Sequence, residues 1–181
     1  MKLLPSSIPG CHEIVTEDFT DKRGVFFKTF HIGVFQDLGL ETTWKEEYFS
    51  LSHKNVIRGM HFQIPPMDHG KVVTCLAGSV VDVVLDLRKN SPTYLEYADF
   101  RLTAGAENKM LYIPTGCAHG FLALEDRTLL HYKVSSVYSP RHDSGIAWDS
   151  FGFDWGIDSP IISERDALQP SLKTFVTPFD Q

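Results

Sequence analysis

Side chains that can move protons or bind anions are concentrated between residues 50 and 71 of the sequence. An imidazole, an amide and two cations stand there among mostly apolar neighbours: His61, Gln63, Arg58 and Lys71. Histidine suits a general base because its unperturbed pKa of about 6.5 leaves it largely neutral at neutral pH. Along a regular strand Arg58 and His61 would lie on opposite faces, so one pocket can hold both only if Gly59 introduces a bulge or kink. Taken alone, His61 is more typical of a partly buried structural histidine.

Three more candidates lie farther along the chain. His119 stands among small residues directly after a turn, where a side chain and the backbone can approach a ligand closely. Tyr132 alternates with His131 and Lys133, so it faces the opposite side of its strand from these two polar residues. On its own it would be a core aromatic residue with an anchored hydroxyl. Asp166 lies in an acidic cluster, and such an aspartate most often forms a turn or caps a helix.

The spacing of the histidines does not favour a metal site. Jelly-roll metal centres usually gather two histidines one residue apart, a nearby glutamate and a more distant histidine. Here residues 60–63 read Met-His-Phe-Gln, and His61 with His119 is too small a set for three or four ligands. We therefore expect catalysis without a metal or another cofactor. The three cysteines are odd in number and widely spaced, so neither a disulfide framework nor a thiolate metal site is indicated: Cys11, Cys75 and Cys117.

Composition and charge exclude several classes of protein. A chain of 181 residues with 43% hydrophobic residues fits one domain with a substantial core. The formal net charge of -6, without any basic cluster, argues against nucleic-acid binding because phosphate contacts need clustered cations. The chain reaches Pro5 before any apolar stretch long enough for a signal peptide, and no window approaches the roughly 20 apolar residues of a membrane span. We expect a cytoplasmic protein that binds neither nucleic acid nor membranes.

Short strand-like runs separated by turn residues recur along the chain, and without alternating long helices they favour an all-β, antiparallel jelly-roll barrel. Residues 33–40 are expected to form a short peripheral helix. We predict a single domain over residues 1–181, with the aromatic, proline-bearing segment of about 139–181 packed over the barrel. Asp82 and Asp86 share one face of their strand, which is either a polar lining or a solvated surface. Strands are predicted at 25–31, 44–51, 56–62, 71–76, 79–87, 96–102, 109–113, 119–124 and 128–134.

Six motifs in family order resemble the dTDP-4-dehydrorhamnose 3,5-epimerase family, and the ordered match runs from about residue 22 to residue 168. No single motif is specific, but the ordered set over most of the chain is. The resemblance implies a cupin-type jelly roll, a homodimer, a nucleotide-diphosphate sugar substrate and catalysis without metal. The motifs are Val56-x-Arg58-Gly59-x-His61-x-Gln63, Gly70-Lys71-Val72-Val73, Asp82-Val83-x-Leu85-Asp86-Leu87-Arg88-x-x-Ser91-Pro92-Thr93, Ile113-Pro114-x-Gly116-x-Ala118-His119-Gly120-Phe121, Tyr132-Lys133 and Ile162-Ser163-Glu164-Arg165-Asp166.

The resemblance also implies catalytic roles. His61 matches the family's general base, Asp166 its acidic partner, Tyr132 the general acid and Lys71 the cation near the developing enolate oxygen. A ketone at carbon 4 acidifies the hydrogens on carbons 3 and 5, and the enolate left by proton removal needs nearby positive charge. A carboxylate would orient the histidine and stabilise the imidazolium. A phenol, with an unperturbed pKa of about 10, can return a proton to the other face; Tyr138 is the reserve candidate for that role.

Other residues match the family's substrate pocket, and some depart from it. Arg58 and His119 match positions around the sugar and diphosphate. Lys28 stands where an acidic residue is usual, and Glu46 and Tyr48 replace a usual Gln-x-Asn pair. These changes leave open which nucleobase and sugar bind, and whether one or both carbons are inverted. The predicted substrate-binding residues are Arg23, Phe26, Lys28, Glu46, Tyr48, Ser50, Arg58, Gln63, His119 and Asp143, the last replacing a usual Glu.

The leading hypothesis is an isomerase that epimerises carbon 3, carbon 5 or both in a nucleotide-linked 4-keto-6-deoxyhexose, in deoxysugar biosynthesis for cell-surface polysaccharide. A 3,4-ketoisomerase on a similar barrel would move the carbonyl instead, and product NMR separates the two. A non-catalytic sugar-nucleotide binding module would bind without hydrogen exchange. The matches at Tyr132 and Asp166 favour the epimerase over the ketoisomerase, and the full catalytic set argues against a mere binding module.

Overall fold

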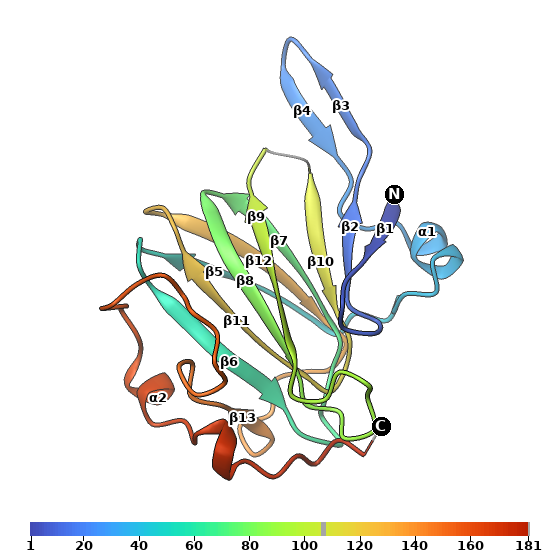
Figure 1. Cartoon of the computed structure of the whole chain (residues 1–181). Coiled ribbons are helices and arrows are strands. Elements are labelled where there is room, and N and C mark those ends of the chain that lie inside the picture. The colour runs from blue at the N-terminus through green and yellow to red at the C-terminus, as the bar shows by residue number, and fades with distance from the viewer. Residues whose placement is uncertain (106–107, 181) are drawn as a thin grey trace.

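The computed structural model describes residues 1–105 and 108–180, and its regular structure is mostly β (Figure 1). One α-helix, α1 (Ile32–Asp37), and two single-turn helices, α2 (Glu164–Ala167) and the 3-10 helix Leu172–Thr174, lie outside the sheets. The strands are β1 (Lys2–Pro5), β2 (His12–Val15), β3 (Asp18–Asp21), β4 (Gly24–Phe27), β5 (Glu46–Ser52), β6 (Ile57–Gln63), β7 (Lys71–Ala77), β8 (Ser79–Asp86), β9 (Tyr97–Thr103), β10 (Lys109–Ile113), β11 (Cys117–Ala123), β12 (Thr128–Val134) and β13 (Asp143–Gly145).

Two antiparallel sheets face each other across the barrel. The six-stranded sheet has the order β1-β2-β10-β7-β12-β5, and the five-stranded sheet has the order β13-β6-β11-β8-β9. Neighbouring strands are mostly not consecutive in sequence, so the chain crosses repeatedly from one sheet to the other, as in a jelly roll. Strands β3 and β4 pair only with each other, and Figure 1 shows this hairpin projecting from the barrel as an arm.

The hydrophobic core is divided by the sheets. Side chains such as Val84, Phe121 and Leu130 fill the space between the two sheets. The opposite face of β8, with Val83 and Leu85, packs against the C-terminal segment. The alternation predicted for this strand is therefore confirmed, because residues of the two parities belong to two different cores. Asp82 and Asp86 are fully buried on the inner face, so they form a polar lining and not a solvated surface.

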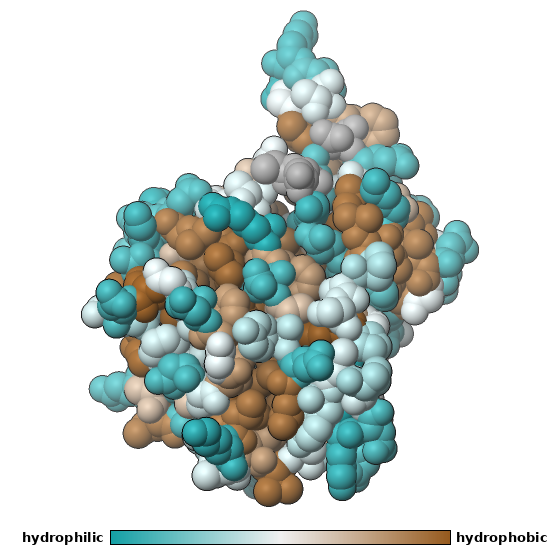
Figure 2. All heavy atoms as spheres, in the orientation of Figure 1, coloured by the Kyte–Doolittle hydropathy of each residue, from teal (hydrophilic) through white to brown (hydrophobic). Residues whose placement is uncertain are grey.

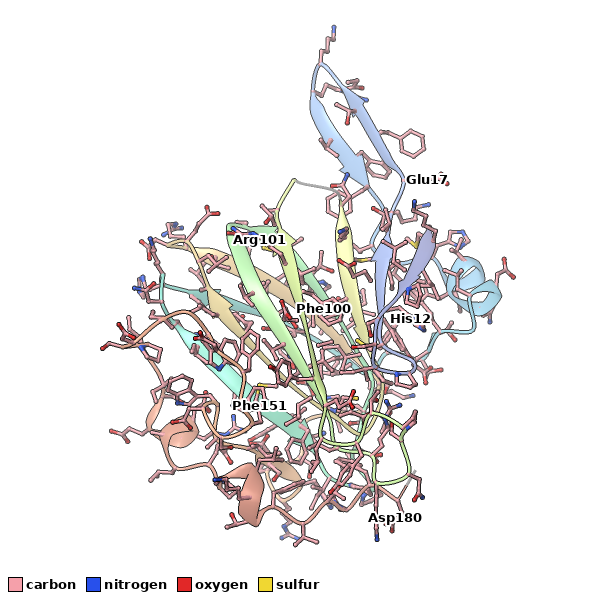
Figure 3. The ribbon with its side chains drawn as sticks, in the orientation of Figure 1. His12, Glu17, Phe100, Arg101, Phe151 and Asp180 are labelled. Carbon is pink, nitrogen blue, oxygen red and sulfur yellow. The ribbon has the colours of Figure 1, made fainter. Side chains whose placement is uncertain are left out.

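The C-terminal segment covers the outer face of the five-stranded sheet. The ring of Phe62 lies 5.4 Å from the ring of Phe175 and 5.8 Å from that of Phe179. At the opposite edge of the sheet, Phe151 contacts Tyr97 of β9 edge-to-face with the ring centroids 5.8 Å apart, and Figure 3 shows Phe151 within this covering layer. The short helix α2 contacts β6 within this segment and carries Asp166.

The predicted all-β jelly roll is confirmed, and each predicted strand run overlaps an observed strand. The expected strand 25–31 is shorter than predicted because only Gly24–Phe27 pairs in the arm, and the helix predicted at 33–40 begins at Ile32 and ends at Asp37. Six elements of three or four residues were missed because so few residues carry no measurable periodicity, namely β1, β2, β3, β13, α2 and the 3-10 helix Leu172–Thr174. Over the described residues, no helix is both long and apolar enough to cross a membrane.

Candidate active site

A pocket of about 410 Å³ lies between the two sheets and collects most of the predicted site residues. Its walls come from β5 and β12 of one sheet and from β6 and β11 of the other. Three of the four predicted catalytic residues and seven of the ten predicted binding residues line it: His61, Lys71, Tyr132, Glu46, Tyr48, Ser50, Arg58, Gln63, His119 and Asp143. Residues as far apart in sequence as Glu46 and Arg165 thus line one pocket.

A bulge in β6 gives the pocket both Arg58 and His61. His61 pairs with His119 on β11, but the next paired residues are Arg58 and Phe121, so β6 holds one extra residue. Gly59 lies in this bulge with φ +147°, and a Cβ there would be 2.5 Å from the Cα of Gly120. Only glycine fits such a close approach at positive φ. The irregularity predicted at this glycine is therefore confirmed.

His61 and Asp166 form a hydrogen-bonded pair at the pocket wall. The distance from Nε2 of His61 to Oδ1 of Asp166 is 2.7 Å, and Asp166 is 3% exposed while Gly59 N–H also donates to its Oδ2 at 3.4 Å. Burial works to raise the pKa of Asp166, but the hydrogen bond and charge of His61 outweigh it, so the carboxyl pKa lies below its ordinary value. A carboxylate can only accept hydrogen bonds, so Nε2 carries the hydrogen and Nδ1 is the nitrogen that can receive a proton.

Helix α2 delivers this carboxylate to the site. Ser163 is its N-cap and accepts a hydrogen bond from the backbone N–H of Asp166 at 3.1 Å. The capping function expected for an isolated aspartate is thus performed by the serine. The Asp166 side chain instead points to β6, where it reaches the bulge and the histidine.

Tyr132 is a buried phenol on the wall formed by the six-stranded sheet. Its hydroxyl lies 3.2 Å from Oγ of Ser50, and its ring stacks on that of Tyr48 with centroids 4.8 Å apart. Burial raises the pKa of Tyr132 above its ordinary value, so the phenol stays protonated at neutral pH. Burial, with the charges of Glu46 and Asp143, also raises the pKa of Tyr48 to about 12. Both tyrosines are therefore hydrogen-bond donors facing the pocket.

Lys71 and His119 are buried residues of the pocket lining, and His119 pairs with the buried Asp82. Nε2 of His119 lies 2.9 Å from both carboxylate oxygens of Asp82, which are fully buried. Burial lowers the pKa of His119 below its ordinary value, with Asp82 opposing the shift, so a neutral imidazole is favoured at pH 7. Burial also lowers the pKa of Lys71 to about 8, against the attraction of Asp82. Lys71 is then mostly a cation at neutral pH, almost without solvation of its own.

Arg58 and Asp143 stand nearer to the pocket mouth. The Nε of Arg58, an exposed residue of the pocket lining, donates to Oγ of Ser52 at 3.1 Å. Asp143 forms an ion pair with Arg165 at 2.6 Å. Arg165 was not predicted as a site residue, and neither was His69, although both line the pocket. Arg165 stands within the family motif at residues 162–166, and His69 lies two residues before Lys71, but neither was assigned a role.

Three predicted binding residues are not brought to this pocket. Arg23 and Phe26 belong to the β3–β4 arm, and Lys28 follows it directly. Arg23 is exposed and pairs with Asp21 at 2.6 Å, far from the residues that line the chamber. Sequence alone could not separate a residue on an arm from one on a barrel wall, because both positions have the same local strand pattern.

The two-sheet jelly roll is a cupin-type fold, and its pocket holds a histidine–carboxylate pair, a buried phenol and a buried amine. The chain belongs to the dTDP-4-dehydrorhamnose 3,5-epimerase family, whose model matches residues 5–174. The predicted isomerase activity, epimerisation of a nucleotide-linked 4-keto-6-deoxyhexose, is confirmed at the level of this family.

Relatives and solved structures support the assignment over nearly the whole chain. A dTDP-4-dehydrorhamnose 3,5-epimerase from Methanothermobacter thermautotrophicus is 42% identical over 170 residues, covering 91% of each chain. The enzyme from Bacillus anthracis, solved with TDP and pyrophosphate bound, superposes with a TM-score of 0.91 at 33% identity and covers 94% of this chain and 99% of that one. A Legionella pneumophila epimerase in complex with dTDP-4-keto-L-rhamnose has a TM-score of 0.92 at 29% identity, covering 99% and 98%.

Proposed function

We propose that His61 is the base that removes a proton beside the ketone of a dTDP-linked 4-keto-6-deoxyhexose, at carbon 3 and carbon 5. The observation that carries this proposal is the 2.7 Å contact between His61 Nε2 and the buried Asp166, which leaves Nδ1 to accept the proton in the pocket. The imidazolium that forms is paired at once with the carboxylate. Two other histidines, His69 and His119, line the pocket. Among the described residues His69 has no carboxylate partner, and the His119 side chain is only 6% exposed, against 28% for His61.

Loss of the proton leaves a negative charge on the oxygen at carbon 4, and Lys71 is proposed to stabilise it. Because this amine is 5% exposed and mostly protonated, water screens its field little. A preorganised cation at the developing oxyanion supplies the largest share of stabilisation in many enzymes of this kind. Arg58, at the rim, is placed to bind a diphosphate group instead.

Tyr132 is proposed to return a proton to the opposite face of the carbon. Its phenol lies on the other sheet from His61 and stays protonated because burial raises its pKa. The proton passes from phenol to carbon, so the configuration inverts, and the phenolate then regains a proton from water while His61 releases its own. Ser50, 3.2 Å from the hydroxyl, orients the phenol for this transfer.

We further propose a homodimer in which the β3–β4 arm of one protomer enters the pocket of its partner. A hairpin of two strands is marginally stable alone. The arm exposes Phe19, Val25 and Phe26, and Figure 2 shows apolar residues near its base below a hydrophilic tip. The partner's pocket would bury these side chains. It would also bring Arg23 close to the diphosphate, beside Arg58.

Mixing two inactive variants tests the arm directly. Arg23→Ala lacks the arm's arginine but keeps an intact pocket, and His61→Asn keeps an intact arm but lacks the base in its pocket. If the arm serves the partner, each mixed dimer gains one complete site, and random pairing restores about a quarter of wild-type activity. If mixing after subunit exchange restores nothing, or if the protein sediments as a monomer, the dimer proposal is wrong.

The proposed reaction is tested by incubation with dTDP-4-keto-6-deoxyglucose in heavy water. We expect mass spectrometry to detect one added mass unit for each carbon that exchanges, and NMR to locate deuterium at carbons 3 and 5. Parallel incubations with CDP- and GDP-linked analogues test the nucleotide, since Lys28, Glu46 and Tyr48 depart from the family pattern. Exchange at a single carbon would restrict the reaction to that carbon, and no exchange with any of these sugars would refute the proposed function.

A further inference from the structure

Gln63 was predicted to bind substrate, but its side-chain amide is already occupied by the protein. It is 4% exposed. Its Nε2 lies 2.8 Å from Met67 O and 3.1 Å from Val137 O, with two side-chain acceptors also within 3.2 Å, so both amide hydrogens are engaged. Its Oε1 accepts the backbone N–H of Ser139 at 2.6 Å. Gln63 therefore holds the chain on both sides of Tyr138.

Glu46 holds the residue between them. Its carboxylate Oε2 accepts the backbone N–H of Tyr138 at 2.8 Å. Glu46 begins β5 in the six-stranded sheet, while Gln63 ends β6 in the five-stranded sheet. Two side chains from opposite walls of the pocket thus grip three consecutive residues, Val137 to Ser139.

The hydrogen bonds from Glu46 and Gln63 are the main contacts that fix the backbone around Tyr138. Within residues 1–105 and 108–180, neither Val137 nor Tyr138 makes a backbone–backbone hydrogen bond. The Tyr138 phenol is 3.4 Å from Oδ2 of Asp143, and the residue is 57% exposed although it lines the pocket. A half-exposed aromatic ring on an irregular segment would sample many positions if its backbone were released.

We propose that Glu46 and Gln63 are positioning residues that clamp Tyr138 as a fixed wall of the pocket mouth, against which the bound sugar nucleotide packs. The inference rests on the proposed function and extends it to residues that do not react. Releasing the clamp weakens binding of the nucleotide sugar, while the chemistry between His61 and Tyr132 proceeds. The clamp also explains how a carboxylate is tolerated at Glu46 in a pocket for an anionic substrate, since a backbone N–H takes up one of its oxygens.

Steady-state kinetics of clamp variants test the proposal. Gln63→Leu and Glu46→Ala each remove hydrogen bonds to the segment, and we expect KM to rise about tenfold while kcat stays within about threefold. Glu46→Gln keeps an acceptor oxygen, so it should restore most of the affinity lost in Glu46→Ala. If Glu46→Gln is as impaired as Glu46→Ala, the charge of Glu46 acts on the substrate directly and the clamp is refuted.

A double-mutant comparison separates positioning from a general structural defect. In a Tyr138→Ala background the clamp has no ring to hold, so adding Gln63→Leu should raise KM by less than about twofold more. If Gln63→Leu raises KM by the same factor in the Tyr138→Ala background as in the wild type, the proposal is wrong. Gln36→Leu, which changes an exposed glutamine on α1, serves as the matched control and should have wild-type kinetics.

Amide hydrogen exchange without substrate tests the clamp independently of the reaction. The N–H groups of Tyr138 and Ser139 should exchange at least about tenfold faster in Glu46→Ala and Gln63→Leu respectively, with the amides of β7 and β8 unchanged. Unchanged exchange at both positions would refute the clamp even if the enzyme is an epimerase. Conversely, a wild-type enzyme inactive on every sugar tested would refute the proposed function and leave this measurement standing.

Discussion

Replacing Asp166 with asparagine removes one negative charge behind the proposed base and leaves the shape of the site unchanged. The carboxylate contacts Nε2 of His61 at 2.7 Å and is outside the set of pocket-lining residues, so it touches no substrate. Its role in the mechanism is to stabilise the imidazolium formed when His61 takes a proton. The variant should therefore lower kcat with little change in KM, because an interaction made only after proton removal has been weakened.

The expected loss follows from the geometry of the pair. Charges centred about 4 Å apart interact by about 4 kcal/mol at an effective dielectric constant of about 20, equivalent to about 10³-fold in rate. The His61 side chain is 28% exposed, which admits some solvent screening, and asparagine keeps a dipole near Nε2. We therefore expect kcat for deuterium exchange in Asp166→Asn to fall by about 10²- to 10³-fold. A variant that is folded by circular dichroism and retains kcat within about threefold of wild type would refute this reasoning.

Three further predictions concern stability, each measured by urea denaturation. Gly59→Ala places a Cβ 2.5 Å from the Cα of Gly120 at φ +147°, so unfolding free energy should fall by about 2–4 kcal/mol, and a loss below about 1 kcal/mol would contradict the bulge. Asp86→Ala leaves Arg88 without its buried partner and should lower the unfolding free energy by about 3–5 kcal/mol. An unchanged unfolding free energy would show that the pair does not stabilise the fold. Burial lowers the pKa of His69 to about 3, so its contribution to the unfolding free energy is complete above pH 6.5 and is lost as pH falls, by about 2 kcal/mol at pH 5. His69→Gln should reduce this pH dependence of the unfolding free energy, and the same dependence in variant and wild type would refute the prediction.

The barrel strands were predictable because each carries its own signal. In β8 the alternation of valine and leucine with aspartate identifies both the strand and its two faces, and the structure assigns those faces to two separate cores. The N-terminal strands β1 and β2 and the first arm strand, β3, carry no such signal, whereas the second arm strand, β4, was predicted within the run 25–31. Strand β2, for example, is defined by its pairing with β10, about 95 residues later, and four residues cannot encode that partner.

Most residues of the site could be predicted from the sequence, but their relative positions could not. His61 and Asp166 are 105 residues apart, and only the motif resemblance linked them before their 2.7 Å contact was seen. The bulge at Gly59 could be anticipated because two pocket residues with opposite parity require one. The use of Gln63 as an internal anchor could not, because its partners lie in an irregular segment whose path depends on the whole barrel.

Deuterium exchange by His61→Asn tests the central claim most directly. The wild-type enzyme, incubated with dTDP-4-keto-6-deoxyglucose in heavy water, should incorporate deuterium beside the ketone. His61→Asn should lose this exchange by at least about 10³-fold, since asparagine cannot accept the proton, while Tyr132→Phe should still exchange but form little inverted product. Wild-type exchange in a correctly folded His61→Asn protein would contradict the assignment of His61 as the base.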